Sequence, residues 1–207
     1  MYKALIVDDH PVVRLAVGML LREEGIDVVG EASSGLDAVR LSRELAPDIV
    51  ILDIGIPQLS GLEVIGRLRS SSPAPRILIL TSQAPGLFSE RCKQAGASGY
   101  IYKADDLRGV VRAIQTVMDG YTCFPELSSS SVRAADAVDE MELLSRLSDR
   151  ELSVLRQLSL GHSNKDIAES MMLSNKTIST YKVRIFEKLN VSSLVELSEV
   201  AKRNSLI

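Results

Sequence analysis

Carboxylates, a hydroxyl and a lysine directly follow apolar stretches at four places along this chain of 207 residues. Asp8 and Asp9 follow the first stretch, Asp53 the second, Thr81 the third and Lys103 the last. Short apolar runs rich in Val and Ile predict strands that are buried on both faces of a parallel sheet. Ligands of open α/β sheets bind beyond the carboxyl ends of the strands. We therefore expect these five side chains to converge on one small acidic pocket.

Such a cluster of carboxylates predicts a divalent cation, because the negative charges repel one another unless a cation lies among them. An all-oxygen site suits Mg²⁺, which uses few carboxylates and commonly a phosphate oxygen. One carboxylate then remains free to attack phosphorus and form an aspartyl-phosphate. Asp53 ends the middle strand of the three and is the predicted acceptor. Lys103 and Thr81 would contact the phosphoryl oxygens.

Helical patterns between these strands predict the rest of the first domain. Apolar residues recur at helical spacing after Pro11. Four further helices are predicted at 38–45, 62–68, 87–95 and 107–118. Strands that alternate with helices build βαβ units, so residues 1–120 are predicted to form an α/β doubly wound sheet of five parallel strands, with 28–30 in the remaining strand.

The stretches VDDHP, ILDIGIPQLSG, LTSQ and GASGYIYK resemble the receiver domain of two-component response regulators over about residues 1–120. The resemblance implies that Asp9 binds the metal directly and that Asp8 does so directly or through water. It also implies that the backbone carbonyl of Gly55 faces the metal and that Asp53 is the phosphoacceptor.

Two further residues are implied to act as the receiver's switch. Thr81 would move toward the phosphoryl group, which Lys103 also contacts. Tyr100 matches the aromatic residue that swings inward when this threonine moves.

A change of composition after Gly120 predicts a domain boundary. Residues 121–147 contain four consecutive serines, and they carry five acidic residues against two basic ones. This composition is typical of a linker, although 134–144 has the pattern of a helix.

Residues 148–207 have the signals of a small all-α domain of four helices. Capping boxes are present at Ser148, Ser163 and Ser193, and Ser174 is a further N-cap. The predicted helices are 149–160, 164–172, 175–189 and 194–204. The very short turn between the second and third helices predicts a helix-turn-helix.

The third of these helices is predicted to bind DNA, since residues 174–190 carry four basic side chains against one acidic one. The segment 147–197 resembles the LuxR-type output domain, and both halves together resemble the NarL/FixJ family, nearest its BvgA/EvgA-type subgroup. The resemblance implies base contacts from Ser179, Thr180 and Val183. It implies phosphate contacts from Lys176, Thr177, Arg184 and Lys188.

The resemblance implies a transcription regulator that is not an enzyme. Its partners would be a sensor histidine kinase or its phosphotransfer domain, double-stranded promoter DNA and RNA polymerase. A homodimer is expected, because one short helix offers few base contacts. The candidate dimer surface on the last helix is Leu194, Leu197, Val200 and Ala201, a stripe that could equally be core.

Two other classes of protein are weighed against this interpretation. A phosphohydrolase of haloacid dehalogenase type needs an Asp two residues after the nucleophile, where this chain has Gly55. A helix-turn-helix recruited for protein contacts is disfavoured by Ser179 and Thr180, which are neither bulky nor apolar.

The remaining signals favour a cytoplasmic protein. No apolar stretch approaches a membrane span, and no signal peptide is evident. Cys92 and Cys123 form no CxxC pair, which indicates unpaired thiols in a reducing compartment. His10 is interpreted as a loop residue and His162 as a capping or surface residue, since neither has zinc-ligand spacing.

Overall fold

The computed structural model describes residues 1–104, 108–126, 135–204 and 206–207. The start of the helix predicted over 107–118 lies outside the described residues, as does the stretch 127–134 of the predicted linker. No helix in the described part of the chain has both the length and the apolar character that a membrane span needs.

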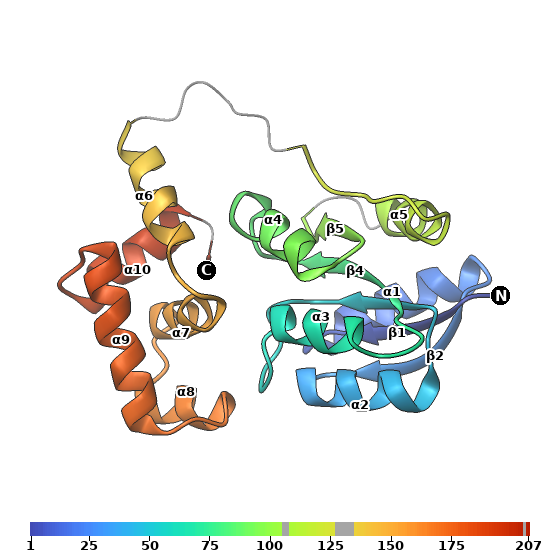
Figure 1. Ribbon diagram of the computed structural model, residues 1–207, viewed down its shortest axis with the longest axis horizontal. Helices are drawn as coiled ribbons and strands as arrows, with labels where there is room; N and C mark the ends of the chain where they lie inside the picture. Colours follow the sequence, from blue (N-terminus) through green and yellow to red (C-terminus); the bar gives the residue numbers. More distant parts are fainter. Residues whose placement is uncertain (105–107, 127–134, 205) are drawn as a thin grey trace. The chain divides into compact units, whose positions relative to one another are not determined.

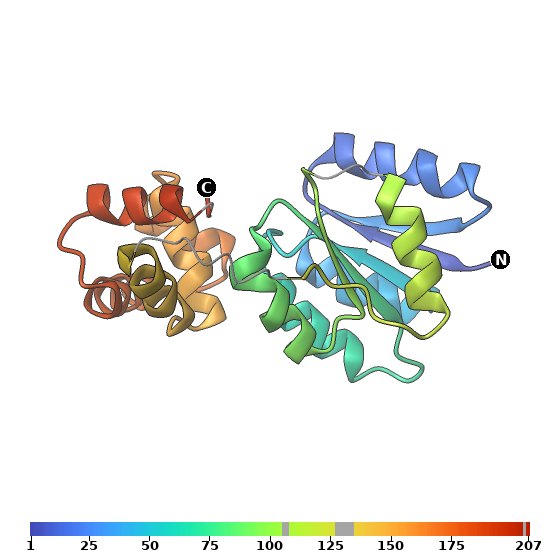
Figure 2. The same ribbon diagram turned by 90° about the horizontal axis from the view of Figure 1, so that it is seen from above.

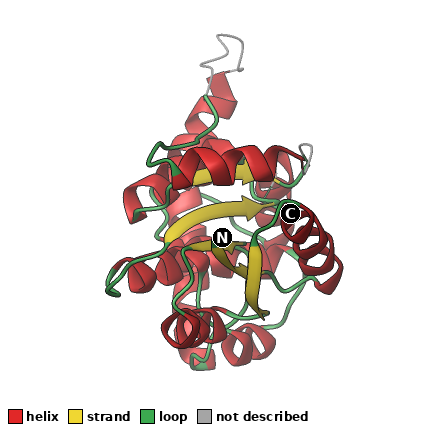
Figure 3. Ribbon diagram, turned by 90° about the vertical axis from the view of Figure 1, so that its right-hand side faces the viewer, coloured by secondary structure: helices red, strands yellow, loops and turns green. Residues whose placement is uncertain are grey.

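The chain divides into two compact units (Figure 1), and the first, Met1–Glu126, is an open sheet with helices on both faces (Figure 3). Its strands are β1 (Lys3–Val7), β2 (Asp27–Ala32), β3 (Ile49–Leu52), β4 (Arg76–Thr81) and β5 (Gly99–Tyr102). They pair in parallel in the order β2-β1-β3-β4-β5. This confirms the predicted doubly wound sheet, although β2 is longer than the predicted 28–30 because its pairing with β1 continues to Ala32.

Five helices connect and cover these strands. They are α1 (Pro11–Glu23), α2 (Gly35–Leu45), α3 (Gly61–Arg69), α4 (Pro85–Ala95) and α5 (Arg108–Met118). On one face of the sheet, α1 and α5 enclose a core that contains Leu21, Ile114 and Ile51 (Figure 2). The other three helices form a row in which α3 contacts both α2 and α4. Strand side chains alternate between the two faces, so a strand covered on both sides is apolar throughout.

In the second unit, Leu127–Ile207, all regular secondary structure of the described residues is helical. Its helices are α6 (Ala135–Ser145), α7 (Asp149–Ser159), α8 (Asn164–Ser170), α9 (Asn175–Leu189) and α10 (Leu194–Arg203). The last four match the four predicted helices to within two residues at each end. Between α8 and α9 lies the short turn of a helix-turn-helix, and these two helices pack against each other.

The helix α6 falls within the segment predicted as a linker, and it packs on the second unit. Leu144 is fully buried, and the Glu140 carboxylate accepts hydrogen bonds from Arg203 Nη2 and Asn204 Nδ2, both at 2.7 Å. The packed unit therefore extends to the N-terminal side of residue 148, because an apolar side chain and an ion pair attach this helix to it.

Serine caps begin each helix from α7 to α10. The capping side chains, each of which accepts from a backbone N–H three residues later, are Ser148, Ser163, Ser174 and Ser193. The reciprocal capping box is complete at Ser148 and Ser163. At Ser193 it is incomplete, because Glu196 accepts instead from the backbone N–H of Ser192 at 2.7 Å.

Candidate functional site

The carboxyl ends of β1, β3, β4 and β5 bring together the five side chains that strand-end reasoning predicted. Asp8 and Asp53 are 2% and 5% exposed, and Thr81 is fully buried. Lys103 follows the edge strand β5 and reaches past β4 to the carboxylates that follow β3 and β1. Asp9 is exposed at the rim. The sheet therefore builds one acidic site, with β3 near its middle.

Asp53 is held by donors on both of its carboxylate oxygens. Oδ1 accepts from Thr81 Oγ1 at 2.7 Å and from the backbone N–H of Gly55 at 2.8 Å. Oδ2 accepts from Lys103 Nζ. These contacts fix the orientation of a carboxylate that would otherwise be costly to bury as an anion.

Lys103 joins the two buried carboxylates, since its ammonium also lies 2.6 Å from Asp8 Oδ2. Burial alone would disfavour the charged ammonium. The attraction of Asp53 and the hydrogen bonds to Asp53 and Asp8 outweigh burial and raise the pKa of Lys103. The lysine therefore carries its positive charge at neutral pH.

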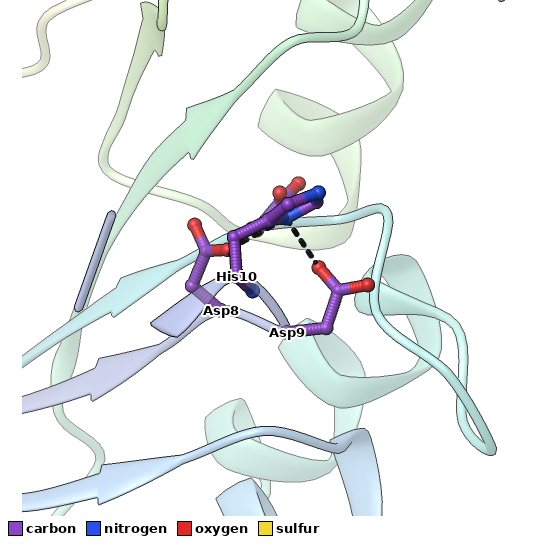
Figure 4. A group of neighbouring side chains, drawn as sticks. Asp8, Asp9 and His10 are labelled. Atoms are coloured by element: carbon purple, nitrogen blue, oxygen red, sulfur yellow. Dashed lines mark hydrogen bonds and ion pairs between the residues drawn. The ribbon is translucent and has the colours of Figure 1, made fainter. Parts of the chain in front are cut away.

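His10 adds an imidazole to the acidic cluster, although its sequence context indicated only a loop residue. Its Nδ1 lies 2.8 Å from Asp9 Oδ1 and 3.2 Å from Asp8 Oδ1, so the ring lies between the two carboxylates (Figure 4). Its backbone N–H also donates to Asp8 Oδ1 at 2.9 Å. The histidine is therefore attached to the site by both backbone and side chain.

Arg14 supports the same turn and was not among the predicted site residues. Its Nη1 donates to the backbone carbonyl of Asp8 at 2.7 Å, and its Nε donates to Glu31 at 3.2 Å. The only sequence signal would have been its position one turn into the helix that follows the acidic pair.

A chain of hydrogen bonds leads from Thr81 to Tyr100. Thr81 Oγ1 accepts from the backbone N–H of Gln83 at 3.3 Å, and the Tyr100 hydroxyl donates to the Gln83 carbonyl at 2.7 Å. Tyr100 is buried, and burial, followed by nearby negative charge, raises the pKa of its phenol. It is therefore a neutral hydrogen-bond donor here.

The geometry is suited to phosphoryl chemistry. A fixed carboxylate can attack phosphorus, and the neighbouring ammonium and hydroxyl can then bind phosphoryl oxygens. Asp8, Asp9, His10 and Asp53 each offer one ligand atom, and these four atoms lie within 4.8 Å of one another. Three carboxylates so close together also fit a hard divalent cation.

In the second unit, α9 presents the predicted DNA-contacting surface. The exposed residues among those predicted are Lys176, Ser179, Thr180, Val183, Arg184 and Lys188, and Thr177 is half-buried. On the inner side Ile178, Ile185 and Leu189 are buried. Asn164 of α8 donates to Ser179 Oγ at 3.2 Å, which joins the two helices of the helix-turn-helix.

Lys188 differs from the other cations of α9, because its ammonium is used inside the unit. It lies 2.7 Å from Glu151 Oε2 and donates to the Arg146 carbonyl at 3.3 Å. The Glu151 side chain is only 4% exposed, and it also accepts from the backbone N–H of Ser148 at 2.7 Å. Lys188 therefore neutralises a buried carboxylate at the start of α7.

The predicted dimer stripe on α10 is mostly core. Leu197 and Ala201 are fully buried, Val200 is 5% exposed, and α10 packs against α7. Leu194 is exposed, as is its neighbour Val195. Of the two alternatives for this stripe, the structure supports core for three of its four residues.

Family models match both units of the chain. Residues 4–115 match the response regulator receiver domain, and residues 145–201 match the bacterial regulatory proteins of the luxR family. The chain belongs to the response regulators. A receiver domain joined to a LuxR-type DNA-binding domain makes it a transcription regulator of NarL/FixJ type.

Curated relatives resemble this response regulator over nearly its whole length. BvgA of Bordetella pertussis, named as a transcription regulator of virulence factors, is 53% identical over 205 residues, which cover 99% of this chain and 98% of that protein. The DNA-binding transcriptional activator EvgA of Escherichia coli K12 is 36% identical over 203 residues, which cover 98% of each chain.

Solved structures of RcsB from Salmonella share the fold. One has a TM-score of 0.77 at 24% identity and covers 98% of both chains. Another, in which RcsB is bound to a promoter in the presence of the phosphomimetic BeF₃⁻, has a TM-score of 0.70 at 23% identity and covers 98% of this chain and 99% of that one.

Proposed function

We propose that Asp53 accepts a phosphoryl group from a phosphohistidine of a sensor kinase or its phosphotransfer domain, and that this raises affinity for promoter DNA. The observation that carries the proposal is the fixed Asp53 carboxylate, with Thr81 and Lys103 both bonded to it. In the transfer, an Asp53 oxygen forms a bond to phosphorus while the bond from phosphorus to the histidine nitrogen breaks.

Mg²⁺ is the proposed cofactor, held by Asp9, Asp53 and the Gly55 carbonyl with Asp8 beside them. When bound, it would neutralise charge on the transferred group. Lys103, which already carries its proton, would bind a phosphoryl oxygen. Gly55 offers no side chain to activate water, so loss of the phosphoryl group by hydrolysis should be slow.

The proposed switch follows the hydrogen bonds that begin at Thr81. A Thr81 hydroxyl that turns from Asp53 to the phosphoryl group would disturb its contact with the Gln83 N–H, and Tyr100 is bonded to the other side of the same residue. Movement of Tyr100 would then alter the surface formed by α4 and β5.

The proposed DNA contacts come from α9 in the major groove. Ser179, Thr180 and Val183 would face bases, and Lys176, Thr177 and Arg184 would bind phosphates. Lys188 belongs with this second group only if it can leave Glu151. RcsB dimers have been described on DNA, and we propose a homodimer here that acts with RNA polymerase in the cytoplasm.

The decisive experiment measures binding of the purified protein to promoter fragments at fixed salt, with and without acetyl phosphate and Mg²⁺. We expect affinity to rise about tenfold with the phosphodonor, within the usual range of coupling between two sites. Asp53→Asn should abolish the increase.

A matched control is Asp27→Asn, which changes an exposed aspartate at the start of β2, at the opposite end of the strands. This variant should respond like the parent protein. An increase that persists in Asp53→Asn would refute Asp53 as the acceptor.

A further inference from the structure

We infer that His10 is a nitrogen ligand of the metal site, so that the site prefers transition-metal ions such as Mn²⁺ and Co²⁺ to Mg²⁺. This inference rests on the proposed function, since it concerns the same cation site. Its consequence is that the occupancy of the receiver's cation site depends on which divalent ion is available.

The position of the imidazole supports this assignment. Its Nδ1 is 2.8 Å from Asp9 Oδ1 and 3.2 Å from Asp8 Oδ1 (Figure 4). The four candidate ligand atoms of Asp8, Asp9, His10 and Asp53 lie within 4.8 Å of one another. An ion with bonds of about 2.1 Å places opposite ligands about 4.2 Å apart, so small side-chain adjustments bring all four to one ion.

The backbone holds the histidine in this position. Its N–H donates to the Asp8 carboxylate, and its carbonyl accepts from Val13 and Arg14 in the first turn of α1. Pro11 begins that helix directly after it. The Arg14 side chain fixes the Asp8 carbonyl on the other side of the turn. Only two side-chain torsions therefore remain to direct the ring.

The donor atoms of the site determine which ions it binds more tightly. Mg²⁺ binds oxygen ligands, whereas imidazole nitrogen suits later first-row ions, whose affinity for such sites rises from Mn²⁺ through Co²⁺ to Ni²⁺. One nitrogen among three carboxylates therefore adds affinity for Mn²⁺ and Co²⁺ and little for Mg²⁺.

The alternative role of His10 is that of a cation paired with the two aspartates. The two roles predict opposite effects of removing the ring. As a paired cation, the His10 ring would have to be displaced by the metal ion, so removal of the ring would strengthen metal binding. Removal of a ligand weakens metal binding.

The test uses untagged full-length protein with Mn²⁺ alone as the spectroscopic probe. Pulsed electron paramagnetic resonance detects a ¹⁴N nucleus bonded to Mn²⁺, and selective labelling with ¹⁵N-histidine changes that signal. The chain has only two histidines, so His10→Ala and His162→Ala assign it. We expect the nitrogen signal in the parent protein and in His162→Ala, and its loss in His10→Ala.

Calorimetric titration measures the affinities of the parent protein and the variants for Co²⁺ and Mg²⁺. His10→Ala should weaken Co²⁺ binding about tenfold, which corresponds to about 1.4 kcal/mol, and Mg²⁺ binding less than about twofold. Asp9→Asn should lose binding of both ions, which identifies the site. His10 is exposed, and circular dichroism should show the parent fold in His10→Ala.

Failure of the role of His10 and failure of the cation site itself give different results. Binding that Asp9→Asn abolishes, but with no histidine nitrogen signal and no weakening in His10→Ala, overturns the role of His10 and leaves the proposed function intact. Binding that is equally strong in Asp9→Asn overturns the cation site itself, and with it this inference.

Discussion

Lys103 is the cation that compensates the buried carboxylates of the acidic site. It contacts the carboxylates of Asp8 and Asp53, which come from different strands and are almost fully buried. Two anions in this environment are tolerated because a cation lies between them. A metal ion bound by the same carboxylates would supply the same compensation.

Replacement of Lys103 by Met should therefore make the first unit depend on Mg²⁺ for its stability. Met keeps most of the side-chain volume but removes the charge. In chelator we expect the free energy of unfolding to fall by about 3 kcal/mol, because two buried carboxylates lose their partner. Urea titration followed by circular dichroism, with and without saturating Mg²⁺, measures the loss and its recovery.

Lys3→Met is the matched control, since Lys3 is exposed at the start of β1. It should change the free energy of unfolding by no more than about 0.5 kcal/mol in either condition. A Lys103→Met protein that is equally stable in chelator and in Mg²⁺ would contradict the compensating role of the lysine.

At the scale of elements, we propose two different tasks for the basic residues of α9. Lys176 is exposed on the surface that we propose binds DNA, whereas Lys188 neutralises the buried Glu151. Burial would raise the pKa of that carboxyl, but the hydrogen bonds from Lys188 and Ser148 outweigh burial and hold the pKa below its usual value of 4.5.

Substitution of the two lysines by Gln should separate these tasks. Lys176→Gln should weaken binding to all DNA sequences and reduce the salt dependence by about one phosphate contact, with stability nearly unchanged. Lys188→Gln should lower the stability of the second unit by about 2 kcal/mol at neutral pH. Salt-dependent anisotropy and urea titration measure the two effects.

The pH dependence of the free energy of unfolding tests the ion pair between Lys188 and Glu151. A carboxyl with a lowered folded-state pKa contributes stability above its unfolded-state pKa, and that stability is lost as pH falls through the folded-state value. The acid loss below about pH 4.5 should therefore be smaller in Lys188→Gln. An unchanged acid loss would mean that Lys188 does not set the ionisation of Glu151.

Most elements could be predicted because their signals are local. A serine followed three residues later by an acidic residue marks a helix start, and the apolar runs of the strands end directly before Asp8 and Asp53. Contacts distant in sequence could not be predicted in the same way. Lys188 and Glu151 are 37 positions apart, and within α9 alone Lys188 cannot be distinguished from the cations that are predicted to bind phosphates.

The same limit applies to the site residues. The proximity of Asp53, Thr81 and Lys103 could be predicted, since the carboxyl ends of parallel strands meet at one edge of the sheet. The direction of the His10 ring and the bond from Arg14 to the Asp8 carbonyl depend on side-chain torsions, which no spacing in the sequence encodes.

At the scale of the whole molecule, two units with separate cores should unfold in two transitions. If the two units unfold independently, a ligand stabilises only the unit that binds it. Mg²⁺ should therefore raise the melting temperature of the first unit alone, and promoter DNA that of the second alone. Scanning calorimetry of the full chain measures both, and Asp9→Asn should remove the Mg²⁺ effect only. One transition that both ligands shift together would show that the units unfold as one.

The division of the chain into two units also suggests how a signal at Asp53 could reach DNA without any change in α9. If phosphorylation pairs two receivers, the covalent connection within each chain brings the two DNA-binding units near each other. The effective concentration of the second DNA-binding unit at its half-site is then about millimolar, whatever the protein concentration in the cell. Phosphorylation would leave the contacts to each base unchanged and would speed binding to the second half-site of the operator.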